Sequence, residues 1–149
     1  MEHHHFLLVA HLLAATIWVG GHLLISLGYL PAAVKQNDSK IILEFEGRYE
    51  RIGMPALLIL VVTGVWMALD YGIGPSQWFH FETPLERVVS VKLSMLFATA
   101  GFAASAQKIA IPRLKNGGSI RPMAVHIIAV TLLGVSMLIL GSFIRYGGL

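Results

Sequence analysis

The chain has 149 residues, of which 56% are hydrophobic and 13% are charged, whereas soluble domains carry about 25% charged residues. This composition excludes a disordered chain, a nucleic-acid-binding module and an ordinary soluble enzyme. Cysteine is absent, which also excludes disulfides, thiolate metal sites and cysteine nucleophiles. Seven histidines stand beside eight acidic residues, and in so apolar a chain histidine is the polar group that needs an explanation.

Four apolar stretches are long enough to cross a hydrocarbon core, which takes about 20 helical residues. We expect spans over residues 6–30, 52–71, 88–109 and 123–144. The sequence therefore predicts an all-α, polytopic membrane protein, a four-helix bundle forming one domain over residues 1–149. The first span has no basic region before it, so we expect it to remain as a helix and not to be a signal peptide. We find no internal repeat.

Turn-forming residues separate the predicted spans. Leu30-Pro31 is expected to end the first helix, and Pro55 to fall in the first turn of the second. The other breaks are at Asn37-Asp38-Ser39, Gly72-Ile73-Gly74-Pro75, Pro112 and Asn116-Gly117-Gly118.

The basic residues predict the orientation of the bundle. The first and third connections each carry four Lys or Arg residues, whereas the second carries only Arg87 and the C-terminus only Arg145. Basic residues concentrate in cytoplasmic loops, so both termini should face the periplasm across a bacterial inner membrane. The lipid bilayer is then the main partner, and the aromatic residues of the outer side would form an interfacial belt: Trp66, Tyr71, Trp78 and Phe79.

Ionisable residues inside spans are costly and usually mark function. His11 and His22 lie eleven residues apart on one predicted helix, which places them on the same face about 16 Å apart. His22 and His126 lie at similar depths, in the inner halves of the first and fourth spans. Two imidazoles on facing helices suit axial ligation of haem b, with propionates paired to nearby basic residues: Arg48, Arg51 and Arg121. The same pair could bind copper or zinc, or each histidine could simply bond within the bundle.

The outer half holds His11 and Lys92. Lys92 could extend to the outer surface, or pair with a propionate, an anionic substrate or Glu86. Partners for His11 at a second haem or metal could be His80, or one of His3, His4 and His5, which could also be a metal collector or an inert terminus. Met95 and Met137 offer soft sulfur for Cu(I), although methionine in a span usually serves packing.

Several motifs resemble the copper-resistance D (CopD) membrane domain. The first helix matches in His11 followed by Trp18-Val19-Gly20-Gly21, and the second in Pro55 followed by Gly64 and Trp66. Val91-Lys92-Leu93 resembles the third helix, and the ending Gly141-Ser142-Phe143-Ile144-Arg145-Tyr146 fits as well. The resemblance covers all four spans and implies a copper-related membrane protein.

The chain is also similar to HemJ-type protoporphyrinogen oxidases, four-helix haem proteins of comparable length. That resemblance implies that His11, Trp66 and Lys92 are cofactor or substrate residues. The chain departs from the pattern because Leu30-Pro31 comes late and is followed by Ala32, and because His126 stands where that family has an acidic motif.

The leading hypothesis is a membrane metalloprotein that binds one or two b-type haems and transfers electrons. Such a protein could act as a haem oxidoreductase. Its partner would be a quinone or a periplasmic redox or copper protein. The first alternative is a protein that transports copper or confers resistance to it, and the second is a HemJ-like porphyrinogen oxidase. A purely structural subunit and a homo-oligomer are also compatible with the sequence.

Overall fold

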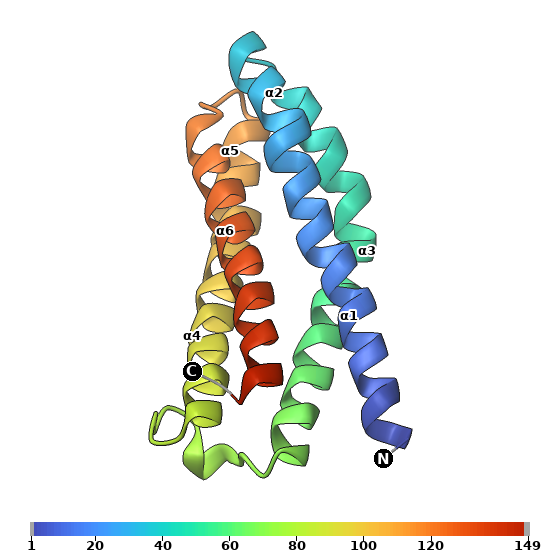
Figure 1. Ribbon diagram of the computed structural model, residues 1–149. Helices are drawn as coiled ribbons and strands as arrows, with labels where there is room; N and C mark the ends of the chain where they lie inside the picture. Colours follow the sequence, from blue (N-terminus) through green and yellow to red (C-terminus); the bar gives the residue numbers. More distant parts are fainter. Residues whose placement is uncertain (1, 148–149) are drawn as a thin grey trace.

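The computed structural model describes residues 2–147, which form helices joined by short turns (Figure 1). Four continuous helical stretches are long and apolar enough to cross a membrane: His3–Gln36, Ser39–Asp70, Pro84–Lys115 and Arg121–Phe143. The described residues contain no strand. The predicted all-α fold with four spans is therefore confirmed, and the chain is a multi-pass membrane protein.

The spans are built from the following elements. The first comprises α1 (Glu2–Leu23), η1 (Leu24–Tyr29) and α2 (Leu30–Gln36), and the second is α3 (Ser39–Asp70). The third comprises α4 (Pro84–Ser105), η3 (Ala106–Ala110) and α5 (Ile111–Lys115), and the fourth is α6 (Arg121–Phe143). Two short 3-10 turns, η2 (Pro75–Gln77) and η4 (Ile144–Tyr146), follow the second and fourth spans.

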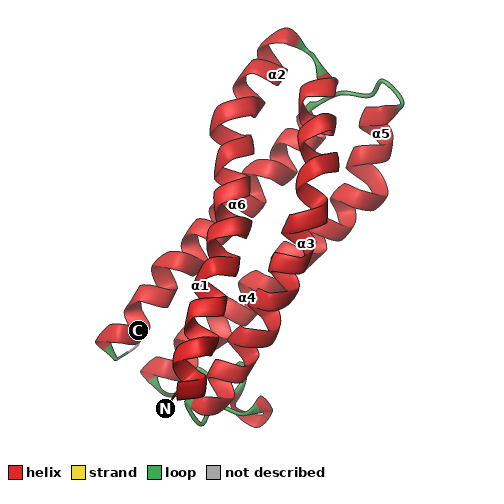
Figure 2. Cartoon of the chain, turned by 90° about the vertical axis from the view of Figure 1, so that its right-hand side faces the viewer, coloured by secondary structure: helices red, strands yellow, loops and turns green. Residues whose placement is uncertain are grey.

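Both ends of the described chain lie at the same end of the bundle, here called the terminal end (Figure 1). The opposite end, called the basic end, holds the turn between α2 and α3 and the loop between α5 and α6 (Figure 2). Lys35, Lys40 and Lys115 are next to these connections in the sequence. Which end faces the cytoplasm stays a prediction from the charge distribution.

The helices extend further toward the basic end than predicted. The first span continues through Pro31 to Gln36, and the third continues through Pro112 to Lys115. The second begins at Ser39, with Asp38 accepting a hydrogen bond from the Lys40 N–H (2.9 Å), so Pro55 lies inside α3 and not in its first turn. At 1.5 Å per residue, the 32 residues of α3 reach about 48 Å, well beyond a hydrocarbon core of about 30 Å.

Wide π-helical turns explain how the two prolines are accommodated. η1 and η3 are π-helical, and each ends two residues before a proline. The Leu30 N–H bonds to the Ile25 oxygen, and the Ile111 N–H bonds to the Ala106 oxygen, five residues back. Proline has no N–H and would collide with the carbonyl four residues earlier in a regular α-helix, and the wider turn relieves both problems.

The structure reveals an internal repeat that the sequence analysis missed. The order of helix, π-turn, proline, short helix, turn and long helix occurs twice, and Pro31 and Pro112 mark a shift of 81 residues. Buried positions coincide under this shift: Leu30 with Ile111, Ala33 with Leu114, Ile42 with Met123, and Gly53 with Gly134. The repeat lies in the burial pattern and the breaks, not in residue identities.

The halves pack asymmetrically despite the repeat. α1 packs along α3 and α6, and α4 packs along α6, but α4 and α3 hardly touch. Under the repeat, the contact between α4 and α3 would be the counterpart of the contact between α1 and α6. The seam between α3 and α4 is therefore open where its counterpart is closed.

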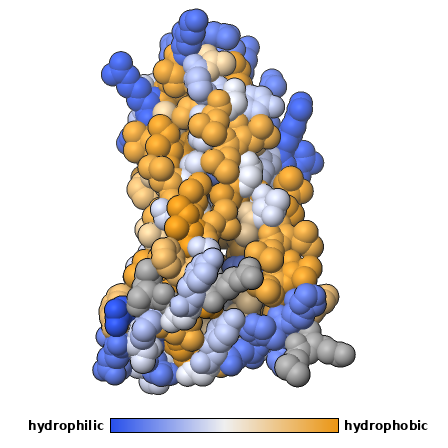
Figure 3. Space-filling view, in the orientation of Figure 1, coloured by the Kyte–Doolittle hydropathy of each residue, from blue (hydrophilic) through white to orange (hydrophobic). Residues whose placement is uncertain are grey.

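Two apolar clusters hold the helices together. One, near the basic end, includes Ile25, Ile42, Leu114 and Met123; the other, near the middle, centres on Trp18, Val19 and Val130. Large apolar side chains also cover the outside, where Figure 3 shows hydrophobic residues over the middle and hydrophilic ones at both ends. This is the surface of a protein in contact with lipid.

Candidate functional site

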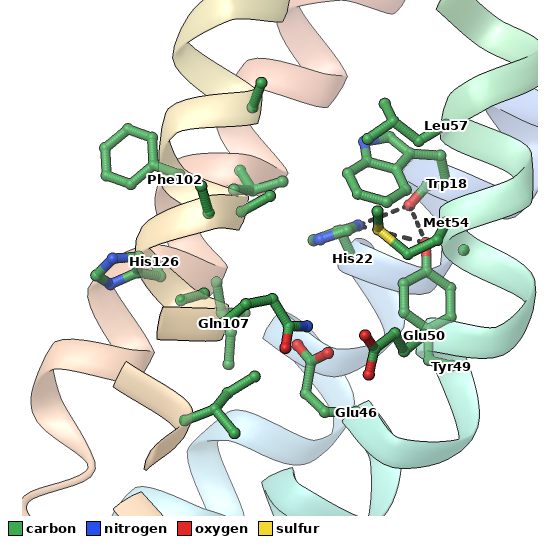
Figure 4. Close-up of a pocket in the computed structure, with 18 of the residues that line it drawn as sticks. Trp18, His22, Glu46, Tyr49, Glu50, Met54, Leu57, Phe102, Gln107 and His126 are labelled. Atoms are coloured by element: carbon green, nitrogen blue, oxygen red, sulfur yellow. Dashed lines mark hydrogen bonds between the residues drawn. The ribbon is translucent and has the colours of Figure 1, made fainter. Parts of the chain in front are cut away.

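A cavity of about 300 Å³ lies between the two halves of the bundle, bordered by both apolar clusters (Figure 4). Every span contributes to its wall. The polar and sulfur-containing lining residues are Trp18, His22, Glu46, Tyr49, Glu50, Met54, Gln107, Met123 and His126. Its volume is at the lower end of the range of small-molecule sites, about 300–1,000 Å³. The exposed lining residues Glu50, Met54 and Gln107 flank the open seam between α3 and α4, so the cavity opens there.

His22 points into this cavity from α1 (Figure 4). Its Nδ1 lies 2.8 Å from the Trp18 carbonyl oxygen. A carbonyl only accepts hydrogen bonds, so Nδ1 carries the proton and Nε2 keeps a free lone pair. The imidazole ring also lies against the Trp18 indole, with ring centroids 4.5 Å apart. His22 is thus held in the tautomer and position that a ligand to a metal needs.

Tyr49 of α3 supports the His22 side chain. Its hydroxyl donates to the Trp18 carbonyl (2.8 Å), and its ring meets the His22 ring edge-on at 5.5 Å. The ring passes close to two glycines, because a Cβ added at Gly21 or Gly53 would collide with it. Glycine at these two positions is what lets α1 and α3 enclose the tyrosine.

His126 lines the same cavity from α6, as its predicted depth required. Its Nδ1 donates to the Pro122 carbonyl (2.7 Å), and its Nε2 accepts from the Ser105 hydroxyl (3.0 Å). Figure 4 shows its ring beside α4, across the cavity from His22. The structure therefore brings the two predicted histidines to one cavity, but the Nε2 of His126 already has a partner.

Sequence reasoning missed most of the lining residues, among them Glu46, Tyr49, Glu50, Met54 and Gln107. Glu46, Glu50 and Met54 lie four residues apart along α3, so they share one helix face. The signal was available, because residues 39–51 contain no proline and could have been read as a continuation of the second helix. Glu46 and Glu50 fall in a predicted connection because their charges exclude them from a hydrocarbon span, whereas Met54 lies inside the predicted span 52–71.

His11 lies on the same helix as His22 but nearer the terminal end, and it does not line this cavity. Its Nδ1 is 2.8 Å from the Thr63 hydroxyl oxygen, and that hydroxyl donates to the Ile59 carbonyl (2.6 Å). The hydroxyl hydrogen is thereby used, so Thr63 accepts from His11, whose Nε2 is again unprotonated. Gly64 gives the ring room, since a Cβ there would lie 3.3 Å from the His11 Cε1 atom.

Lys92 occupies the position equivalent to His11 in the second half and extends to Gly141 of α6, where an added Cβ would lie 3.2 Å from Nζ. Among residues 2–147 it forms no ion pair. The predicted partner Glu86 is engaged elsewhere, because it caps α4 by accepting from the Thr83 and Glu82 N–H groups (both 3.1 Å) and from Gln77 (3.2 Å). Pairing of Lys92 with Glu86 was therefore wrong.

The other predicted site residues are not part of the cavity wall. Trp66 is 52% exposed on α3. The three arginines predicted to pair with propionates, Arg48, Arg51 and Arg121, are exposed as well. Met95 and Met137 are half-buried in α4 and α6. At the terminal end, His3 and His4 contact Asp70, whereas His5 and His80 are exposed. Across residues 2–147, no three histidine or acidic side chains already surround one metal position.

Comparison with known proteins gives one family. The family model described as CopD, copper resistance protein D, matches residues 43–144. The match includes α4 and α6, with Lys92 and His126, and most of α3, but it does not include α1 with His11 and His22. No curated protein and no solved structure matches the chain.

Proposed function

The chain belongs to the copper resistance protein D family, and we propose that it handles copper as a substrate in the membrane, with His22 receiving the ion. This is the alternative in the sequence analysis, and the family match favours it over haem. The observation that carries it is the free Nε2 of His22, directed into a cavity that also contains a thioether. The resemblance to HemJ-type oxidases gains no support from this match.

The donors around the cavity suit copper in its biological oxidation states. Imidazole and thioether are the ligands that Cu(I) prefers, and imidazole with carboxylate suits Cu(II). His22 and Met54 supply the first set, and Glu46 and Glu50 add the second. The exposed carboxylate of Glu50 flanks the open seam. It could therefore bind the copper ion as the ion passes between the cavity and water.

The charge distribution supports a direction. Cytoplasmic loops are rich in Lys and Arg, so the basic end would face the cytoplasm and the terminal end the periplasm of a bacterial inner membrane. The cavity would then lie in the cytoplasmic half. We also propose one domain, since contacts between α1 and α6 join the halves.

The test compares cavity variants with matched controls. His22→Ala and Met54→Leu should abolish the change in cellular copper that expression of the wild type causes during copper challenge, measured by elemental analysis. His80→Ala, in an exposed loop, and Met67→Leu, on α3 outside the cavity wall, should behave as wild type. Equal copper content in all four variants and the wild type would overturn the proposal.

Haem b is the second candidate, favoured by one observation: His22 and His126 line a common cavity and both carry the proton on Nδ1. Axial ligation by both would require His126 Nε2 to leave Ser105. A bound haem would supply electron transfer, with a quinol or a periplasmic protein as partner. The visible spectrum of the purified protein distinguishes the two: a Soret band lost in His22→Ala and His126→Ala favours haem, and a colourless protein that binds Cu(I) favours copper.

A further inference from the structure

The first turn of α1 meets the last turn of α3 at the terminal end, and three potential metal ligands come together there. His3 Nε2 lies 3.4 Å from Asp70 Oδ2, and His4 Nδ1 lies 3.1 Å from the same oxygen. The His4 ring also meets the Tyr71 ring edge-on, with centroids 5.3 Å apart. Two imidazoles thus converge on one carboxylate from a different helix.

The spacing of these atoms fits a coordination sphere. Zinc binds histidine nitrogen and carboxylate oxygen at about 2.0–2.1 Å in a tetrahedral arrangement, so two such ligand atoms lie about 3.3–3.4 Å apart. Ligands at right angles around Cu(II), at similar bond lengths, lie about 2.9 Å apart. The two observed separations, 3.1 and 3.4 Å, fall within the range of about 2.9–3.4 Å that these two geometries define.

We propose that His3, His4 and Asp70 form a second metal site, for a divalent transition-metal ion of intermediate softness such as Cu(II) or Zn(II). Imidazole and carboxylate are ligands of both ions, and Cu(II) binds the more tightly of the two in the general order of affinities. The side chains do not yet surround one position, but the His3 side chain is 64% exposed and turns without disturbing packed neighbours. Water would complete the coordination.

The site is independent of the inner cavity. It lies at the opposite end of α1 from η1, and its three ligands are absent from the cavity wall. His4 and Asp70 are 66 residues apart in sequence, so a bound ion would link the start of α1 to the end of α3. Binding should therefore raise the thermal stability of the folded protein.

The experiment uses the full chain, purified in detergent through a tag that contains no histidine. With one equivalent of Cu(II), electron paramagnetic resonance should show hyperfine coupling to two nitrogens, and Zn(II) should raise the unfolding temperature by about 5 °C at saturating concentration. His4→Ala and Asp70→Asn should weaken binding of each ion at least about tenfold, the loss of one ligand. Asp70→Asn preserves size and helix content, which circular dichroism checks.

Matched controls separate this site from capture by exposed imidazoles. His5→Ala and His80→Ala remove histidines that do not contact Asp70, and both should bind Cu(II) as the wild type does. Wild-type affinity in Asp70→Asn, or equal weakening in His5→Ala and His4→Ala, would overturn the proposal. His22→Ala should leave the two-nitrogen signal intact, so failure of the copper function and failure of this site would be told apart.

Discussion

The three histidines inside the spans share one hydrogen-bonding arrangement. The Nδ1 atoms of His11, His22 and His126 each donate to an oxygen: the Thr63 hydroxyl, whose own hydrogen goes to the Ile59 carbonyl, the Trp18 carbonyl and the Pro122 carbonyl. Each Nε2 atom is therefore unprotonated and carries a lone pair that can bind a metal ion or accept a hydrogen bond. Metal-binding histidines in proteins are fixed in this way by a partner behind the ring. The sequence predicted the three residues but not their tautomers, which depend on contacts between and within helices.

Thr63 tests this arrangement at His11. Replacement by valine keeps the shape of the side chain but leaves the His11 Nδ1–H without an acceptor in the apolar interior. An unsatisfied buried donor costs about 1–3 kcal/mol, so Thr63→Val should unfold at a lower temperature in detergent. Thr63→Ser keeps the oxygen and should retain most of the stability. An unfolding temperature unchanged in Thr63→Val would show that the hydrogen bond contributes nothing to stability.

Gly21 offers a second test at the same scale. A methyl group there would collide with the Tyr49 ring, which holds the Trp18 carbonyl behind His22. Overpacking of this kind costs about 1–3 kcal/mol, so Gly21→Ala should lower the unfolding temperature. The neighbouring Gly20 has nothing within 4 Å of an added Cβ, and Gly20→Ala should be neutral or stabilising because alanine favours the helix. Equal effects of the two substitutions would contradict this account.

At the scale of the helices, the sequence predicted the number of spans but misplaced several ends. Hydropathy finds the part of a helix in lipid, and at Asn37 the polar turn is in the predicted place. It does not report where a helix continues beyond its apolar segment, as α3 does from Ser39 to Arg51. Pro31 predicts the end of the first helix, but the π-turn before it lets the helix continue. Such a turn depends on packing at both ends of the helix, which no local pattern records.

The π-turn in the first span predicts an unusual tolerance to deletion. A π-turn contains one residue more than a regular helical turn, so deleting Leu27 together with Pro31→Ala should restore a regular helix with both sides in phase. This variant should keep its unfolding temperature in detergent within about 5 °C of wild type, a change of 1–2 kcal/mol. Deleting Leu13, which is also exposed but lies in a regular helix, should turn the preceding residues by about 100° and separate His11 from Thr63. Similar stability of both deletions would contradict this interpretation.

At the scale of the whole molecule, the candidate site was predicted in part. Matching the depths of His22 and His126 placed both at one cavity, because depth in a span follows from counting residues. The ring of helices around that cavity could not be predicted in the same way. Glu46 and Glu50 are part of the wall because α3 continues beyond the predicted span and stands apart from α4. The open seam depends on how the two halves pack against each other, and the sequence of either half alone does not predict this packing.

The absence of cysteine makes the orientation of the molecule directly testable. Ser76 lies in the exposed loop at the terminal end, and Ser119 lies in the exposed loop at the basic end. If the basic end is cytoplasmic, a membrane-impermeant thiol reagent should label Ser76→Cys in spheroplasts, whose inner membrane is intact. The same reagent should label Ser119→Cys only after that membrane is permeabilised. The unsubstituted chain, which has no thiol, is the control for background. Labelling in the reverse order would place the termini and the His3, His4 and Asp70 cluster in the cytoplasm, and the cavity of His22 in the periplasmic half.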